Sequence, residues 1–303
     1  MASRTKKASE KNPIESWAPP EIPRPPLEGK ASDPRLSAAL AARERWHGRS
    51  GRPALKSSTQ AVAFVRERRL VLPTLPSVLP NLLDPIVGRA LTPEERKESQ
   101  AVKTLQSWMP EIRSTPDITE IRLCFQRPTL VQADLWACLK PIAQAREEEA
   151  RTNRKLPPEV REALEILDRR KTIPIDRLGE MLDLSDSDAE RLVGYLESQL
   201  VVISRTEYDE DEEKDVRVVE SFPRWLERAP RMERVVPLER SWTILFLAAL
   251  RSAVTLWSAD LAVLFPWTDE ERERAIQESM DTGMVIPYEE EGQVVYVASP
   301  VPR

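Results

Sequence analysis

The side chains best suited to binding a charged ligand form a cationic group near the N-terminus, and an aromatic ring interrupts it. Its members are Arg43, Arg45, Arg49, Arg52 and Lys56 around Trp46 and His47, followed by Arg66, Arg68 and Arg69 on the next predicted helix. Arginine and lysine contact phosphates, and an aromatic ring can stack on a base, so this combination is typical of nucleic-acid binding. A solubilising basic tail is the alternative interpretation.

Residues that could carry acid–base, nucleophilic or metal chemistry are few. His47 is the single histidine, which argues against histidine acid–base catalysis and against multi-histidine metal sites. Cys124 and Cys138 have apolar neighbours on a predicted strand and a predicted helix, so both are predicted to be core residues. The sequence contains no P-loop, dinucleotide-binding or nucleophile-elbow motif. We therefore predict no cofactor and no metal, and the residues alone do not argue for an enzyme.

The charge is distributed unevenly along the 303 residues. Residues 1–72 contain 15 Lys and Arg against 7 Asp and Glu, a balance of +8, whereas the whole chain has a net charge of −5. The remaining residues therefore carry −13, and the chain is a basic head on an acidic body. With 8 Gly and 27 Pro, the composition favours helices and stiff connections over the glycine-rich loops that hold nucleotides.

The apolar segments are too short for a membrane span, which needs about 18 or more residues. The longest, Ile244 to Leu250, has the length of a buried helix face. The basic N-terminus is not followed by an apolar segment, so no secretory signal is recognised, and two cysteines cannot build a disulfide framework. We expect a cytoplasmic protein that makes no membrane contact.

The first 150 residues are predicted to divide at about residue 56. Residues 1–56 are rich in proline and arginine and lack hydrophobic periodicity, so they are predicted to be a disordered basic tail, with at most a short helix around Leu36 to Trp46. Residues 57–150 are predicted to be an α/β segment. It contains a helix that runs into a strand, a helix that is capped by Thr92 and reaches about Trp108, the strand "ITEIRLCF" and a long helix that starts near Thr129. A divergent winged helix is an alternative for this segment.

The second half contains an internal repeat with a period of 83 residues. Apolar positions of the first copy coincide with those of the second, as with Leu164 and Leu247, or Val202 and Val285. Each copy has three predicted helices followed by a strand, an acidic turn and a strand, and the third helices open at Ser185 and Thr268 with capping patterns. The pattern predicts winged helices at residues 151–228 and 229–303. The expected fold is α+β and mostly helical, with tandem winged-helix (helix-turn-helix) domains.

The predicted third helices have the wrong charge for reading DNA. The balance is −3 from Ser185 to Leu200 and −4 from Thr268 to Met284, and the first acidic turn holds seven acids and one lysine between Glu207 and Asp215. Like charges against phosphate would cost several kcal/mol. We therefore predict that neither helix reads duplex DNA, and that the acidic faces suit docking to a basic protein.

The order of these features resembles the winged-helix DNA glycosylases of the AlkZ/YcaQ type. The resemblance spans about residues 59–299 and rests on "AVAFVRERRLVLP…LPNLLDPIVGR", "QRPTLVQADLWACLKPI" with "ALEILDRRKTIPIDRLGEML", and "ADLAVLFPWTDEERERAIQESMDTGMV". It implies association with DNA in repair, and a catalytic Gln-x-Gln or Gln-x-Asp pair, for which the candidates here are Gln132 and Asp134. Both fall inside a predicted helix, where positions i and i+2 point about 200° apart. We therefore predict no catalytic role for them.

Two hypotheses of function follow. The first is a non-catalytic, DNA-associated protein that acts in repair or regulation and contacts DNA through the basic N-terminal region. The second is a protein-assembly module that binds a basic partner through its acidic winged-helix faces.

Overall fold

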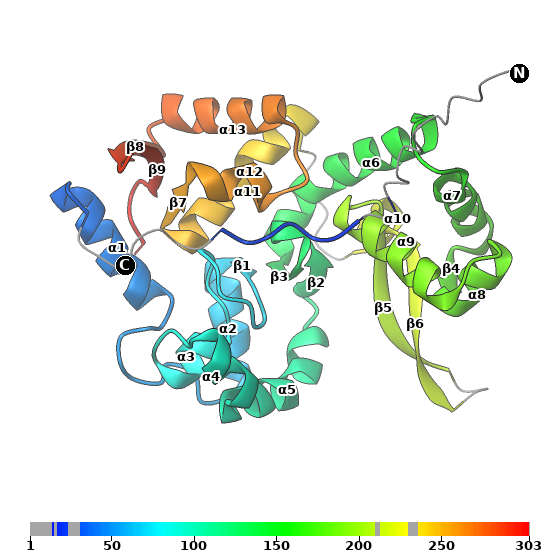
Figure 1. Ribbon diagram of the computed structural model, residues 1–303, viewed down its shortest axis with the longest axis horizontal. Coiled ribbons are helices and arrows are strands. Elements are labelled where there is room, and N and C mark those ends of the chain that lie inside the picture. Colours follow the sequence, from blue (N-terminus) through cyan, green and yellow to red (C-terminus); the bar gives the residue numbers. More distant parts are fainter. Residues whose placement is uncertain (1–13, 15–16, 24–30, 210–212, 230–235, 303) are drawn as a thin grey trace, which may run out of the picture. The chain divides into compact units, whose positions relative to one another are not determined.

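The computed structural model describes the chain except residues 1–13, 15–16, 24–30, 210–212, 230–235 and 303. The chain forms two compact units, and neither is continuous in sequence. Residues 143–225 join residues 1–19 in one unit, and residues 20–142 join residues 226–303 in the other. Both units are α+β, with many helices and small antiparallel sheets, so the predicted class is confirmed (Figure 1).

The unit built on residues 143–225 contains a group of helices and strands that we call the second group. Its elements are α7 (Pro158–Arg170), β4 (Thr172–Pro174), α8 (Ile175–Met181), α9 (Asp186–Ser198), β5 (Val202–Asp209) and β6 (Lys214–Ser221). The strands form an antiparallel sheet in the order β4-β6-β5. Apolar residues of α7, α8 and α9 pack on the sheet in one core, and the hairpin β5–β6 extends away from it (Figure 1). Helices α6 (Trp136–Thr152) and α10 (Phe222–Arg228) flank this group in sequence.

The C-terminal part of the other unit, the third group, has the same order of elements. It consists of α11 (Leu238–Ala253), β7 (Thr255–Trp257), α12 (Ser258–Leu264), α13 (Asp269–Asp281), β8 (Val285–Glu290) and β9 (Gln293–Ala298). Its sheet order is β7-β9-β8. The strands β4 and β7 begin 83 positions apart, as do α8 and α12, α9 and α13, and β5 and β8. Both predicted caps are present, because the side chains of Ser185 and Thr268 accept hydrogen bonds from backbone N–H groups three residues later.

The N-terminal part of the same unit, the first group, has this sheet order a third time. Its elements are α2 (Ser58–Arg68), β1 (Leu70–Val71), α3 (Leu83–Val87), α4 (Pro93–Glu98), α5 (Gln100–Arg113), β2 (Ile118–Arg122) and β3 (Pro128–Gln132), with strands in the order β1-β3-β2. Thr92 caps α4 as predicted, but the helix expected to continue from there ends at Ser99. That residue has an extended backbone, and its side chain caps α5.

The turn between the first helix and the first strand has the same unusual backbone in all three groups. Arg69, Lys171 and Val254 occupy this position, with φ of 70°, 67° and 68°. Positive φ is uncommon for residues other than glycine, and especially for β-branched valine, at a cost of about 1–3 kcal/mol. Three chain segments of different sequence therefore adopt the same strained connection.

The short helix expected around Leu36 to Trp46 is present, but it is packed on another part of the chain and does not belong to a disordered tail. Helix α1 (Pro34–Trp46) is capped by the Asp33 side chain, and Leu36, Ala39 and Ala42 are buried. It contacts β7 of the third group (Figure 1). Small alanines give a helix a weak hydrophobic stripe, and its burial depends on a surface more than 200 residues away in sequence. Much of the predicted tail before Ala31 lies outside the described residues.

The region around Gln132 also differs from the prediction. The long helix expected from Thr129 begins at Trp136, because β3 and the short 3-10 helix η2 (Ala133–Leu135) occupy the preceding residues. Cys124, in the 3-10 helix η1 (Cys124–Gln126), and Cys138, in α6, are buried and free, as predicted. Burial raises the pKa of both thiols, that of Cys138 to about 12, so both remain protonated.

Candidate nucleic-acid interface

The cations of the predicted nucleic-acid site do not form one exposed surface. The side chains of Arg43, Arg49 and Arg68 are less than one tenth exposed and are held inside the unit. Arg45, Arg52 and Lys56 are exposed and make no ion pair with another described residue. The guanidinium groups of Arg43, Arg49 and Arg68 are therefore not accessible to a phosphate in this structure. A phosphate contact stays a prediction for Arg45, Arg52 and Lys56.

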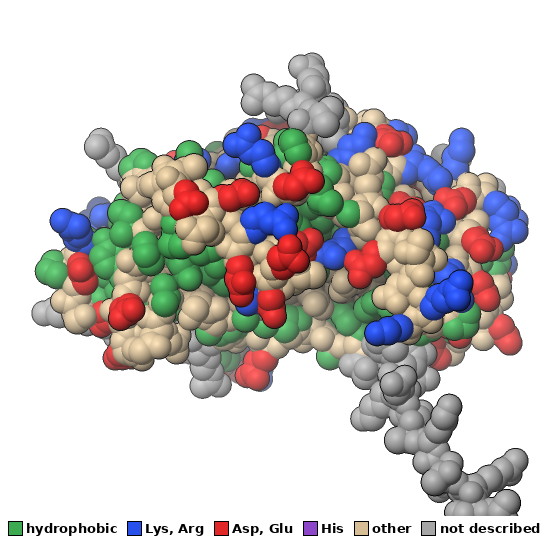
Figure 2. All heavy atoms as spheres, turned by 90° about the horizontal axis from the view of Figure 1, so that it is seen from above, with side chains coloured by type: hydrophobic (Ala, Val, Ile, Leu, Met, Phe, Trp, Pro, Cys, Tyr) green, Lys and Arg blue, Asp and Glu red, His purple; other side chains and the backbone are tan. Residues whose placement is uncertain are grey.

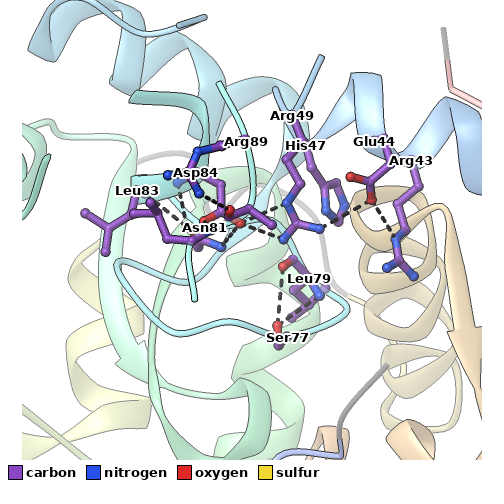
Figure 3. A network of polar contacts seen from close by, with 12 residues as sticks. Arg43, Glu44, His47, Arg49, Ser77, Leu79, Asn81, Leu83, Asp84 and Arg89 are labelled. Carbon is purple, nitrogen blue, oxygen red and sulfur yellow. Dashed lines mark hydrogen bonds and ion pairs between the residues drawn. The ribbon is translucent and has the colours of Figure 1, made fainter. Parts of the chain in front are cut away.

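Asp84 is the centre of the cluster that buries Arg49. Its carboxylate is inaccessible to solvent, and it accepts hydrogen bonds from Arg49 Nε at 2.8 Å, Arg96 Nη2 at 2.6 Å and Asn81 Nδ2 at 2.9 Å. Figure 3 shows Arg49 between Asp84 and Glu44 of α1. The cluster therefore ties the end of α1 to α3 and α4, which is a structural role.

His47 and Arg43 attach α1 to the third group. His47 Nε2 lies 3.1 Å from the backbone oxygen of Ser252, and Arg43 Nη1 donates to Thr255 Oγ1 at 3.3 Å. Burial, followed by the charges of Arg49 and Arg43, holds the pKa of His47 well below its usual value. The imidazole is therefore neutral, and its Nε2–H donates to the Ser252 carbonyl.

Trp46 is covered by a cation from its own chain. The Arg68 guanidinium lies 4.3 Å from the centre of the Trp46 ring and 3.7 Å from that of Phe64. Arg68 Nε also donates to the backbone oxygen of Trp46 at 2.7 Å. The Arg68 guanidinium therefore covers one face of the Trp46 ring, and stacking of a base on this ring stays a prediction.

Arg66 and Arg69 are more accessible, but each is paired with an acid. Arg66 donates two hydrogen bonds to Asp117, at 2.8 and 2.7 Å, and Arg69 Nη2 lies 2.5 Å from Asp134 Oδ2. The Asp117 contacts raise the pKa of Arg66. Each pair cancels most of the positive charge that a phosphate would meet.

The candidate catalytic residues lie close together, contrary to the helix-based prediction. Gln132 ends β3 and Asp134 lies in η2, and Gln132 Oε1 accepts a hydrogen bond from the Asp134 backbone N–H at 3.1 Å. The Gln132 side chain therefore caps η2, while the Asp134 carboxylate pairs with Arg69. Both functional groups have structural partners, and the two residues do not lie on opposite sides of one α-helix.

The arginines of α9 and its hairpin are also neutralised locally. Arg191 pairs with Asp188 of its own helix at 3.1 Å. Arg217 of β6 reaches back to α9 and contacts Glu190 at 2.6 Å and Glu197 at 2.9 Å. The acids of α9 therefore hold the hairpin against the helix, and the surface between them carries little net positive charge.

The arginines of α13 show the same arrangement. Arg272 pairs with Asp269 at 2.8 Å, and Arg274 pairs with Glu270 at 2.7 Å. A shallow groove runs along this helix, lined by Glu270, Glu273, Arg274, Ile276, Gln277 and Tyr296. On the face that Figure 2 shows, acidic and basic side chains are interspersed, and the blue ones do not form a continuous area. The described parts of α9 and α13 therefore do not present a positive reading surface.

Helix α5 differs from α9 and α13, and its surface was not singled out from the sequence. Its apolar side, which includes Ala101 and Leu105, packs in the core. The opposite side exposes polar residues of low charge, and these are Gln100, Lys103, Gln106 and Ser107. Lys103 makes no ion pair with a described residue, and one acid, Glu111, lies near this surface. The 3.6-residue spacing of the apolar positions, from Ala101 to Ile112, is the signal that identifies this face.

The described residues contain no cluster of three or more His, Cys, Asp or Glu side chains placed to hold a metal ion. Within the same residues, none of the helices combines the length and the apolar character that crossing a bilayer requires.

Comparison with known proteins gives a distant structural similarity. No family model matches the sequence, and no curated protein matches it. Among solved structures, the chain is similar to the Streptomyces sahachiroi DNA glycosylase AlkZ, with a TM-score of 0.47 and 10% sequence identity. The alignment covers 85% of this chain and 69% of that chain. Similarity at this level does not show membership of a family.

Proposed function

We propose that this chain is a non-catalytic, cytoplasmic protein made of three winged-helix units, and that it associates with DNA through α5 of the first group. The observation that carries the proposal is the difference in charge pairing among α5, α9 and α13, the helices that directly precede the three hairpins. The cations of α9 and α13 are paired with acids, whereas α5 exposes Lys103 and neutral polar side chains.

The assignment of three winged helices is supported by topology. A winged helix has a short strand after its first helix and a hairpin after its third, and all three strands join in one sheet. Each group follows this order, with the last strand in the centre of its sheet. The shared positive φ at Arg69, Lys171 and Val254 supports a common design. On this interpretation the α/β segment at residues 57–150 contains a winged helix with a proline-rich insertion before α5.

The assignment of the DNA contact is supported by residue types and charge. In winged helices that read DNA, the third helix enters the major groove, where glutamine recognises adenine and lysine contacts guanine or phosphate. Residues 58–132 contain 10 Lys and Arg against 8 Asp and Glu, a balance of +2. The balances of residues 158–221 (9 against 19) and residues 238–298 (4 against 11) are −10 and −7. The first group is therefore the only one of the three with a positive charge balance, and the other two would repel phosphate.

The test is binding of the full chain to a fluorescent DNA duplex at about 50 and about 200 mM salt, because affinity that depends on phosphate contacts falls steeply between these two concentrations. We expect binding that weakens with salt, and we expect Lys103→Glu to weaken it at least about fivefold at the lower salt. The matched control is Arg274→Glu on α13, which should leave affinity within about twofold, since this arginine is already paired. Absence of binding at low salt, or equal losses in the two variants, would refute the proposal.

A second function is supported by the groove on α13. Glu270 and Glu273 line it together with the apolar side chains of Ile276 and Tyr296, a combination that suits a basic peptide with an apolar anchor. On this view the third group docks onto a basic protein partner. Titration with a lysine-rich peptide that contains one leucine should show binding to the full chain that Glu273→Lys abolishes and Asp176→Lys, on α8, does not.

A further inference from the structure

Two residues near the N-terminus pack on the second group. Ile14 is buried and belongs to the same hydrophobic core as Val160 and Leu192. Trp17 lies on Gly194 of α9, and its backbone N–H donates to the Ile14 carbonyl. A Cβ atom at position 194 would lie 2.9 Å from Trp17 Cζ3 and 3.2 Å from Cη2. A Cβ atom at this position would therefore require the indole to shift.

The indole covers the side of α9 that faces away from the helical core. Leu192 and Leu196 point into the core, and Gly194 lies two positions from each. Two positions correspond to about 200° around an α-helix, so Gly194 is on the opposite side. This is the side that a winged helix turns toward DNA when its third helix enters the groove. Even so, Gly194 and Ser198 are buried in this structure.

The third group supplies a comparison inside the same chain. Gln277 of α13 occupies the position 83 residues after Gly194, and it is exposed on the open groove described above. The outward side of a helix in this architecture therefore does not need a cover. Glycine inside a helix costs about 0.5–1 kcal/mol relative to alanine, and at position 194 the contact with Trp17 offsets that cost.

We propose that the outward face of α9 is a peptide-docking surface, and that Trp17 of the same chain is its occupant. The aromatic anchor is Trp17, and the residue of α9 against which it packs is Gly194. Charge complements the shape, because Asp186 is exposed on α9 and four cations against one acid precede Ile14 in the sequence. While it is docked, the segment prevents other ligands from binding the outward face of α9. This holds for either function proposed for the first and third groups.

The direct test observes Trp17 in the full chain. Incorporation of 5-fluorotryptophan gives one fluorine resonance for each of the eight tryptophans, and Trp17→Phe identifies that of Trp17. We expect Gly194→Leu to move this resonance to the position of a solvent-exposed indole and to leave the others in place. The matched control is Gln277→Leu, the equivalent substitution in α13, which should not move it. A Trp17 resonance that is already at the exposed position in the wild type, or that ignores Gly194→Leu, refutes the proposal.

A smaller substitution separates displacement of Trp17 from unfolding. Alanine favours a helix over glycine by about 0.5–1 kcal/mol, so Gly194→Ala should not weaken α9 itself. Its Cβ still meets the indole, and we expect the Trp17 resonance to shift in the same direction while the melting temperature does not fall. An unchanged Trp17 resonance in this well-folded variant would contradict the assigned contact.

A competition experiment tests the surface as a binding site. A fluorescent peptide with the sequence of residues 8–23 is added to full chains of wild type, Trp17→Ala and Trp17→Ala/Gly194→Leu. In the wild type a tethered occupant has an effective concentration of about 1 mM, so we expect the peptide to bind Trp17→Ala at least about tenfold more tightly. The double variant should not bind it. Equal binding to all three chains, or to none, refutes the docking surface, and a fluorine shift that depends on protein concentration refutes its occupation within one chain.

Discussion

Arg49 and Asp84 form an ion pair in which both side chains are almost completely buried, with Nη2 and Oδ2 2.8 Å apart. Arg96 approaches the other carboxylate oxygen at 2.6 Å, so one acid neutralises two guanidinium groups. This cluster explains why a sequence that is rich in arginine near its N-terminus does not present a matching cationic surface. These arginine charges form ion pairs inside the unit and stabilise its fold.

Removal of the Asp84 charge is expected to destabilise the unit formed by residues 20–142 and 226–303. Asp84→Asn leaves buried Arg96 without its counter-charge and buried Arg49 with only Glu44, 3.5 Å away, which should lower the free energy of unfolding by about 3–5 kcal/mol. Urea denaturation followed by circular dichroism measures the loss. The control is Glu95→Gln, which breaks the solvent-exposed pair with Arg89 and should have little effect. Similar losses in the two variants would contradict the structural role of the Asp84 cluster.

Docking of α1 is expected to contribute measurably to stability. Leu36 is completely buried, so Leu36→Ala should cost about 2–4 kcal/mol in unfolding free energy. The exposed Ala38 of the same helix provides the control, since Ala38→Ser should cost less than about 0.5 kcal/mol. If Leu36→Ala has no effect and amides of α1 exchange with solvent at the rate of an unfolded chain, α1 is not docked.

Acid should weaken the attachment of α1 through His47. The pKa of His47 in the folded chain is below its usual 6.5, so the unfolded chain binds this proton first as pH falls. The stability that depends on neutral His47 is therefore present above pH 6.5 and is lost as pH falls below it. Unfolding free energies measured from pH 8 to pH 5 should decline less in His47→Gln, whose amide can still donate to Ser252. Parallel profiles would contradict a buried, neutral imidazole.

Asp260 is expected to have the opposite effect on the pH dependence of stability, because it destabilises the folded chain as pH rises. Burial raises the pKa of its carboxyl from 3.8 to about 6, against the hydrogen bond from the Trp257 backbone and the charge of Arg43. A raised pKa contributes stability below pH 3.8 that is lost as pH rises through 6. Relative to wild type, Asp260→Asn should therefore gain roughly 2–3 kcal/mol of stability at pH 7 compared with pH 4. An identical pH profile in both proteins would show that the carboxyl is not desolvated.

Base excision is not expected from Gln132 and Asp134. The Asp134 carboxylate is paired with Arg69 and the Gln132 amide oxygen is bonded to the backbone, so neither group is free to activate water. Wild type and Gln132→Ala, incubated with alkylated DNA, should both leave it without abasic sites. Abasic product that requires Gln132 would establish an enzyme and overturn the non-catalytic proposal.

Local rules accounted for the elements whose signals lie within one stretch of chain. The caps at Ser185 and Thr268 could be predicted, and so could helix α2 with strand β1 directly after it. Each of these signals depends on neighbours three or four residues away. The 83-residue offset was visible because the apolar positions of one group coincide with those of another. Helix α1 was underestimated for the opposite reason, since its weak stripe becomes stable only on a distant surface.

The sequence by itself determined which residues are charged, which are apolar and where helices begin, and these properties sufficed for the α+β class and for the acidic character of α9 and α13. Only the tertiary structure decided which charges remain available, because an ion pair such as Arg49 with Asp84 joins residues far apart along the chain. It also decided that Trp17 meets Gly194, a contact between positions 177 residues apart that no local pattern records. Long-range contacts require loop closure and matched surfaces, and periodicity carries information about neither.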